Sequence, residues 1–140
     1  MKLFIACVMI LFVFLQGDCQ SAKTDKSKLE GEWWLMPVLP SDTATGHIPN
    51  INFDITKKKF KGFTGCNDMS GSIKVNGNVL SFDKDIVLTR IACEGFNEKD
   101  FIANLLRVDH YQLKDGVLTL LIDKTPISKW MRRAKVSVAP

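Results

Sequence analysis

The stretch SIKVNGNVLSF, residues 72–82, carries a β-hairpin signal. Two short segments suited to strands, 72–75 and 78–82, flank the dipeptide Asn76-Gly77. Asn-Gly is the strongest two-residue hairpin signal, because both central positions of the favoured type I′ turn need a positive φ. The stretch therefore predicts a pair of antiparallel strands.

Strand signals continue on both sides of this hairpin. Before it, Ile51, Phe53 and Ile55 alternate with polar residues, which is typical of a half-buried strand. After it, Asp115-Gly116 is a second hairpin signal. The other predicted strands, which are rich in aliphatic or aromatic residues, are 31–36, 60–63, 86–91, 111–113, 117–122 and 127–132.

One segment has helical periodicity instead. Phe101, Leu105 and Val108 recur at helical spacing, and Asn97 can cap the N-terminus, with an acidic residue three positions later. The pattern predicts one helix over residues 98–107. A helix this short is marginal alone, so we expect its apolar face to pack against a sheet.

These elements indicate the fold class. A chain of 140 residues fits one domain with one core. Many short strands with one late helix predict a mainly β (α+β) fold. We expect a small antiparallel β-barrel-like sheet with one packed α-helix over residues 29–133, because a nearly closed barrel hides the edges of its sheet.

The N-terminus has the features of an export signal. Lys2 precedes an unbroken apolar run of 13 residues, Leu3–Leu15, which is short for a membrane span and suits a secretory signal peptide. We predict a signal peptide over 1–19, a flexible tether over 20–28 and a loose tail over 134–140.

Two processing routes are open at Cys19. Cleavage after it would put small residues, Gly17 and Cys19, at the two positions that need them. Alternatively, Cys19 is lipidated, as in bacterial lipoproteins, although the residues before it match the usual pattern poorly. Both routes predict an exported chain in the periplasm or outer envelope, lipid-anchored in the second.

Export leaves Cys66 and Cys93 in the mature chain. In a compartment that tolerates disulfides, they can form only one intramolecular pair. We predict that bridge, and the alternative is two buried thiols that never meet.

Several motifs lie in a specific order along the chain. They are Trp33-Trp34, Gly65-Cys66-Asn67 with Gly71, TRIAC at 89–93, Glu98 with Phe101, the spacing of Leu105, Val108 and Tyr111, and Leu118-Thr119-Leu120. Together they resemble the META-domain family of HslJ-like heat-shock proteins. The resemblance implies an antiparallel β structure with one packed helix, in bacterial envelope proteins linked to stress or motility, and no established catalytic residue, substrate or cofactor.

The loop that contains Gly65 permits two interpretations, and the tryptophan pair gives one further expectation. The loop with Gly65, Asn67 and Gly71 is either a constrained turn, because Gly and Asn tolerate positive φ, or a binding loop on a rigid scaffold. Trp33 and Trp34 should point to opposite faces of their strand, which predicts one in the core and one at the surface.

No pattern predicts catalysis, a cofactor or a metal site. A cysteine nucleophile needs a nearby base, and His47 and His110 are the only histidines. Two cysteines 27 positions apart lack zinc-ligand spacing. The mild net charge of +4 and the basic stretches 57–61 and 129–135 suit either solvated surface or an anionic neighbour.

We expect a non-catalytic monomer that binds an unknown envelope protein or component, or supports envelope stress tolerance. It would bind no nucleic acid and would touch the membrane only through a lipid on Cys19. A small-ligand carrier with a pocket in the barrel mouth is the alternative. An exposed apolar patch with a polar rim favours the first function, and a sizeable aromatic-lined cavity favours the second.

Overall fold

The structure is a computed structural model and describes residues 25–133. The predictions for the signal peptide (1–19), for Cys19 and for the tail (134–140) lie outside the described residues. Within the predicted tether, the chain enters a 3₁₀ turn, η1 (Lys26–Leu29), and the carboxylate of Asp25 accepts a hydrogen bond from the backbone N–H of Ser27.

The described residues form nine strands, one α-helix and two 3₁₀ turns. The strands are β1 (Gly31–Leu35), β2 (Asn50–Asp54), β3 (Lys59–Phe63), β4 (Asp68–Asn76), β5 (Val79–Phe82), β6 (Val87–Leu88), β7 (His110–Lys114), β8 (Val117–Ile122) and β9 (Thr125–Met131). The helix α1 (Glu98–Arg107) lies between β6 and β7 in the chain, and η2 (Pro40–Thr43) lies between β1 and β2.

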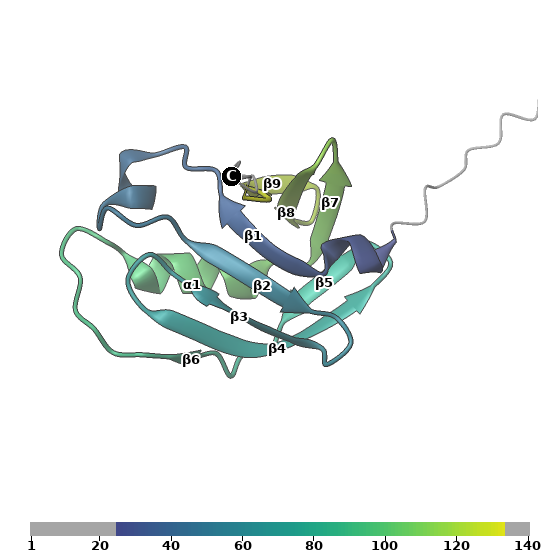
Figure 1. The fold of residues 1–140 in the computed structure, drawn as a ribbon, viewed down its shortest axis with the longest axis horizontal. Helices are drawn as coiled ribbons and strands as arrows, with labels where there is room; N and C mark the ends of the chain where they lie inside the picture. Colours follow the sequence, from purple (N-terminus) through teal and green to yellow (C-terminus); the bar gives the residue numbers. More distant parts are fainter. Residues whose placement is uncertain (1–24, 134–140) are drawn as a thin grey trace, which may run out of the picture.

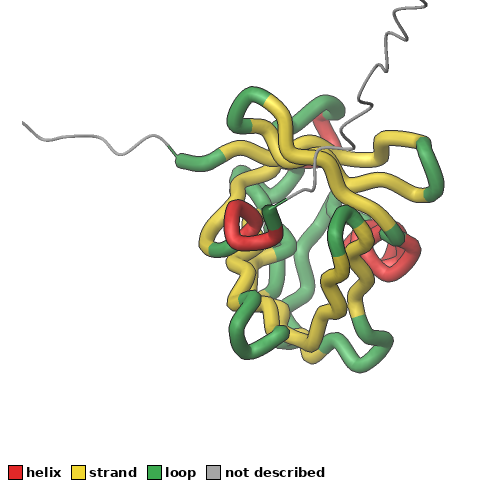
Figure 2. Tube along the Cα trace, turned by 90° about the vertical axis from the view of Figure 1, so that its right-hand side faces the viewer, coloured by secondary structure: helices red, strands yellow, loops and turns green. Residues whose placement is uncertain are grey.

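Eight of these strands close into an antiparallel barrel. They pair in the order β3-β2-β1-β9-β8-β7-β5-β4, and β3 also pairs with β4, which closes the ring. The short β6 pairs with β4 on the side away from β3. Strands β7, β8 and β9 cross β2, β3 and β4 at a steep angle (Figure 1), and Figure 2 shows the strands, in yellow, from the side. The predicted mainly β barrel with one helix is confirmed.

Alternation along the strands divides side chains between the interior and the outer surface. In β1, Trp33 and Leu35 are buried in the core, whereas Trp34 between them is only half-buried. The expectation for the two tryptophans is thus confirmed. The interior is filled by large apolar side chains, among them Leu29, Ile51, Phe53, Ile73, Leu80, Tyr111, Leu118, Leu120 and Trp130.

The helix has the predicted bounds and cap. The backbone N–H of Asp100 donates to Oδ1 of Asn97 at 3.2 Å. Leu105 and Val108 are buried in the core, and Phe101 packs against it. Among residues 25–133, the structure contains no helix with the length and apolar character needed to cross a bilayer.

The central hairpin turns one residue later than predicted. Asn76 pairs with Val79, so the two turn residues are Gly77 and Asn78, and only Gly77 has a positive φ, of 60°. A positive φ at the first position alone is the pattern of a type II′ turn. The observed register pairs Val75 with Leu80 and Ile73 with Phe82, and both Leu80 and Phe82 are buried. At Asp115-Gly116 both φ values are positive, 52° and 76°, and the predicted type I′ turn is confirmed.

The strand predicted over 86–91 is much shorter in the structure. Only Val87 and Leu88 pair with β4. The N–H of Thr89 still donates to the Asp68 carbonyl of β4, but farther on the N–H of Ile91 donates to Oδ1 of Asn67 at 2.7 Å. A polar side chain therefore replaces a neighbouring strand as the partner of this segment.

Candidate functional site

Two cysteines that flank the segment with β4, β5 and β6 meet in the structure. Cys66 and Cys93 form a disulfide, with their Cα atoms 6.0 Å apart. That separation lies within the usual range for bridged cysteines. The bridge ties the start of β4 to the chain just before α1.

The side chain of Asn67, beside this bridge, is 1% exposed and hydrogen-bonded through both ends of its amide. Its Oδ1 accepts from the Thr89 hydroxyl at 2.8 Å and from the Ile91 N–H. Its Nδ2 donates to the Ile91 carbonyl at 3.0 Å and to the Glu98 carboxylate at 2.9 Å. One amide thus joins the loop before β4, the segment after β6 and the first turn of α1.

Buried Thr64 extends the same network. Its hydroxyl donates to the other oxygen of the Glu98 carboxylate and accepts from the backbone N–H of Asn67 at 2.9 Å. Residues from the GCN motif, the TRIAC motif and the helix start therefore form one connected structure. Their spacing in the sequence reflects this shared role in the fold.

The proposed binding loop is largely internal. Gly65 is buried with a φ of 101°, and a Cβ atom at Gly71 would lie 2.8 Å from the ring of Phe60. Both positions therefore need glycine, one for its conformation and one for space. Together with the fully used amide of Asn67, this geometry favours the constrained-turn interpretation of the loop.

A cleft opens at a different place, between the chain after β1, helix α1 and strand β9. Its volume is about 720 Å³. Apolar and aromatic side chains dominate the lining, including Val38, Leu39, Phe96, Phe101, Ile127 and Trp130. Polar residues also line it, including Asp42, Asn97, Asp100 and Lys129.

Two aliphatic side chains project from the loop at one side of this cleft. Val38 is 82% exposed and Leu39 is 60% exposed. The carboxylate of Asp42 accepts the backbone N–H groups of both residues at 2.8 Å, and prolines flank the pair. The loop is therefore held in a defined shape that presents apolar groups to solvent.

The opposite side of the cleft is aromatic. The ring centroids of Phe96 and Phe101 are 6.2 Å apart, and those of Phe101 and Trp130 are 6.5 Å apart. Trp130 is buried, and its indole N–H donates to Ser128 at 2.8 Å. These residues come from separate segments, so sequence spacing did not reveal the cleft. The available signal was an apolar pair, Val38-Leu39, inside a proline-flanked loop.

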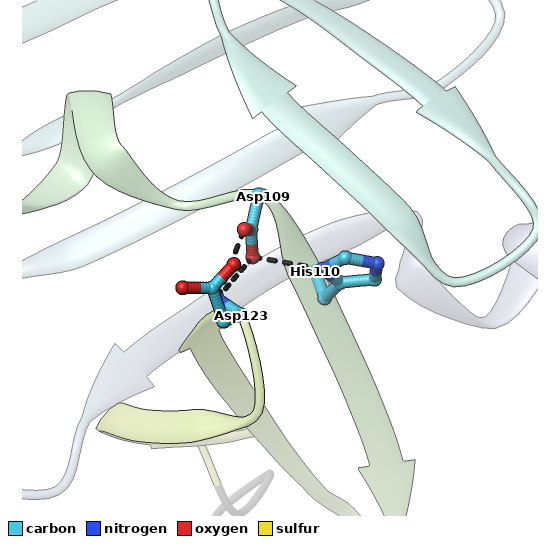
Figure 3. A network of polar contacts seen from close by, with 3 residues as sticks. All are labelled: Asp109, His110 and Asp123. Atoms are coloured by element: carbon cyan, nitrogen blue, oxygen red, sulfur yellow. Dashed lines mark hydrogen bonds and ion pairs between the residues drawn. The ribbon is translucent and has the colours of Figure 1, made fainter.

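A second polar network supports the turn between β8 and β9 (Figure 3). Oδ1 and Oδ2 of Asp109 accept the backbone N–H of Asp123 at 2.8 and 2.9 Å, and Oδ1 lies 2.8 Å from Nδ1 of His110. The hydrogen bond from His110, followed by the bond from Asp123, lowers the pKa of Asp109 below its usual 3.8. The network sits on a hairpin end, and its contacts are those of a structural cap.

We expect Asp109→Asn to destabilise the protein at neutral pH and to have little effect in strong acid. A carboxylate whose pKa is lower in the folded state stabilises the fold above its unfolded pKa, near 3.8. That contribution disappears as the pH falls through the lower folded pKa. Urea unfolding of both proteins between about pH 2 and 7 measures the difference. A constant difference across this range would contradict the assignment.

The C-terminal basic stretch is also partly structural. The Arg132 guanidinium lies 4.0 Å from the Trp33 ring centroid and donates to the Lys28 and Glu30 carbonyls. The Arg133 guanidinium lies 4.6 Å from the ring centroid of Trp34. Within residues 25–133, no three His, Cys, Asp or Glu side chains are grouped so as to hold a metal ion.

Two solved structures are similar to this fold. The NMR structure of a protein from Burkholderia xenovorans has a TM-score of 0.61 at 22% identity, covering 79% of this chain and 88% of its own. The crystal structure of a duf4847 family protein from Bacteroides vulgatus has a TM-score of 0.55 at 16% identity, covering 73% and 92%. At such identities the likeness concerns the fold alone.

Sequence comparison identifies the family itself. No curated protein matches this chain. The family model described as META domain matches residues 27–134, which is most of the chain. The chain therefore belongs to the META domain family.

Proposed function

We propose that this META domain is a non-catalytic binding module of the envelope, and that it holds an apolar segment of a partner protein in the cleft between β9 and α1. The observation that carries the proposal is the pair Val38 and Leu39, exposed beside an aromatic wall and fixed by Asp42. Apolar patches with a polar rim mark interaction sites.

The fixed shape of the loop supports binding to a partner. Ordering a flexible loop costs free energy on association, and a loop that is already ordered avoids that cost. Here two carboxylate hydrogen bonds, together with prolines at positions 37 and 40, restrain the loop. Most of the hydrophobic free energy gained when a partner buries the two side chains would then contribute to the affinity.

Export is part of the same proposal. The apolar run Leu3–Leu15 and the Cys66–Cys93 bridge both suit a chain that folds outside the cytosol. We propose a periplasmic or outer-envelope monomer, attached to the membrane only in the route that lipidates Cys19. A contribution to stress tolerance of the envelope would follow from the partner that it holds.

One observation favours a second function, that of a small-ligand carrier. The cleft volume of about 720 Å³ lies within the range of small-molecule sites, and three aromatic rings line it. A compact apolar ligand would occupy the same surface as the partner segment. The two functions therefore differ in the chemical nature of the occupant.

A photoreactive side chain at position 39, crosslinked in the native envelope, tests both functions. We expect one defined polypeptide adduct, identified by mass spectrometry. Adding Val38→Asp should weaken capture roughly tenfold, which corresponds to the loss of one buried aliphatic side chain. The matched control is position 91, because Ile91 is exposed to a similar degree, 64%.

The adducts distinguish the alternatives. Small-molecule adducts at position 39, without a polypeptide, would support the carrier and reject the partner. The same proteins captured at positions 39 and 91 would reject both functions of the cleft.

A further inference from the structure

A second concave surface lies on the outer face of the barrel, away from the apolar cleft. It spans β1, β2, β3, β4 and β6 and encloses about 530 Å³. Strands β1, β2, β3 and β4 lie side by side in Figure 1, with β6 below them. Its lining combines the ring of Phe63 and the aliphatic side chains of Val87 and Leu88 with polar side chains, among them Asn50, Asn52, Lys61, Asp68 and Ser70.

Strand register sets these side chains in two rows. Asn52 pairs with Lys61, and Lys61 pairs with Ser70. In the neighbouring row Phe63 lies between Asn50 and Asp68. Directly opposed residues on antiparallel strands have Cβ atoms about 4.5–5.5 Å apart. The hollow therefore presents a regular array of closely spaced polar groups beside one aromatic ring.

These polar side chains are free of partners inside the fold. Among residues 25–133, the side chains of Asn50, Asn52, Lys61, Asp68 and Ser70 make no hydrogen bond or ion pair with other side chains or the backbone. Buried Asn67, in contrast, uses both ends of its amide. The hollow thus offers donors and acceptors that a ligand can satisfy.

The ring of Phe63 in the hollow is held in place by a neighbouring ring. The ring of His47 packs edge-on against the ring of Phe63, with centroids 6.0 Å apart and planes at 81°. A ring held at its edge keeps its position while another surface of it stays accessible at the hollow. An aromatic surface beside hydrogen-bonding groups suits a ligand that has both apolar and polar faces.

The charges that line the hollow limit the chemical class of ligand that it can bind. Glu32 and Asp68 contribute two carboxylates to the hollow, against the single ammonium group of Lys61. The local balance is therefore negative, although the whole chain carries +4. Phosphate-rich ligands and anionic lipid surfaces are disfavoured here by repulsion. Amides and carboxylates instead suit neutral hydroxyl groups, which both donate and accept hydrogen bonds.

We propose that this hollow is a binding site for a neutral glycan. Hydroxyl groups of the sugar would bond to Asn50, Asn52 and Asp68, and the C–H face of one ring would pack on Phe63. The site does not depend on the function proposed for the apolar cleft, because the two surfaces share no lining residue.

NMR titration of the ¹⁵N-labelled mature domain with maltohexaose, cellohexaose and chitohexaose tests the proposal. At least one sugar should shift the side-chain amide signals of Asn50 and Asn52 and the backbone signals of Lys61 and Ser70. Asp68→Ala should weaken that binding at least fivefold, roughly the value of one net hydrogen bond. The matched control is Gln112→Ala, an exposed polar residue on β7, which should leave the affinity unchanged.

The remaining outcomes would overturn the proposal. They are the absence of shifts with all three sugars up to their solubility, shifts confined to the apolar cleft, or equal weakening by both variants. A fourth is perturbation of the hollow by phosphatidylglycerol vesicles and not by sugars, which would assign the surface to an anionic membrane instead.

Discussion

Replacing Cys66 and Cys93 together by serine is expected to lower the free energy of unfolding by about 3.5 kcal/mol under oxidising conditions. The bridge closes a loop with a sequence separation of 27, and the chain-entropy model gives this magnitude for such a loop. At about 4 °C per kcal/mol, the melting temperature should fall by roughly 15 °C. Differential scanning calorimetry of both proteins measures the loss.

Reduction provides the control for this experiment. Dithiothreitol should destabilise the wild-type protein by a similar amount and leave the double variant unchanged. Single Cys66→Ser and Cys93→Ser variants should resemble the double variant, because either change opens the bridge. A wild-type melting temperature that is equal in oxidant and reductant would contradict a stabilising role for the disulfide.

Local signals in the sequence predicted much of the fold. The helical spacing of Leu105 and Val108 and the cap at Asn97 predicted α1 with its observed bounds. The apolar run 117–122 predicted β8. In these segments periodicity and turn chemistry indicate the same structure as the packing does, so a local interpretation succeeds.

Segments whose structure depends on distant partners were predicted less well. The apolar residues at 86–91 resemble a strand, but the backbone at Ile91 bonds to the side chain of Asn67, 24 residues earlier. The hairpin at Gly77 turns one residue later than predicted, in a register that pairs Ile73 with Phe82 instead of Leu80. Neither partner can be recognised from the segment itself.

Neither candidate surface could be predicted from the sequence, because the fold brings its residues together from distant segments. Leu39 and Phe101 are ordinary residues of a loop and of a helix, and only the closed barrel brings them to one cleft. Asn52 and Ser70 become neighbours of Lys61 only through strand pairing. The GCN motif was conspicuous in the sequence because glycine and asparagine have special conformational roles, and the structure uses them inside the fold.

Asn67→Ala is expected to cost about 4 kcal/mol of unfolding free energy, comparable to loss of the disulfide. The change would leave both backbone groups of Ile91 without their partner and remove one donor from the Glu98 carboxylate. A net hydrogen bond contributes about 0.5–1.5 kcal/mol and one to a charged group about 1.5–3 kcal/mol, so the lost bonds to Ile91 and Glu98 together amount to about 4 kcal/mol. Urea denaturation at neutral pH measures the loss.

Asn52→Ala is the matched control for that loss, because it removes the same amide from a strand whose outer face is open to solvent. We expect it to change the unfolding free energy by less than about 0.5 kcal/mol. A double-mutant cycle with Glu98→Ala should give a coupling energy of about 1.5–3 kcal/mol for Asn67 and Glu98, because one partner of this charge-assisted hydrogen bond is already gone in each single variant. If Asn67→Ala proves as mild as Asn52→Ala, or if the coupling is zero, the amide does not join α1 to the barrel, and the disulfide and the Thr64–Glu98 hydrogen bond would hold the helix start in place.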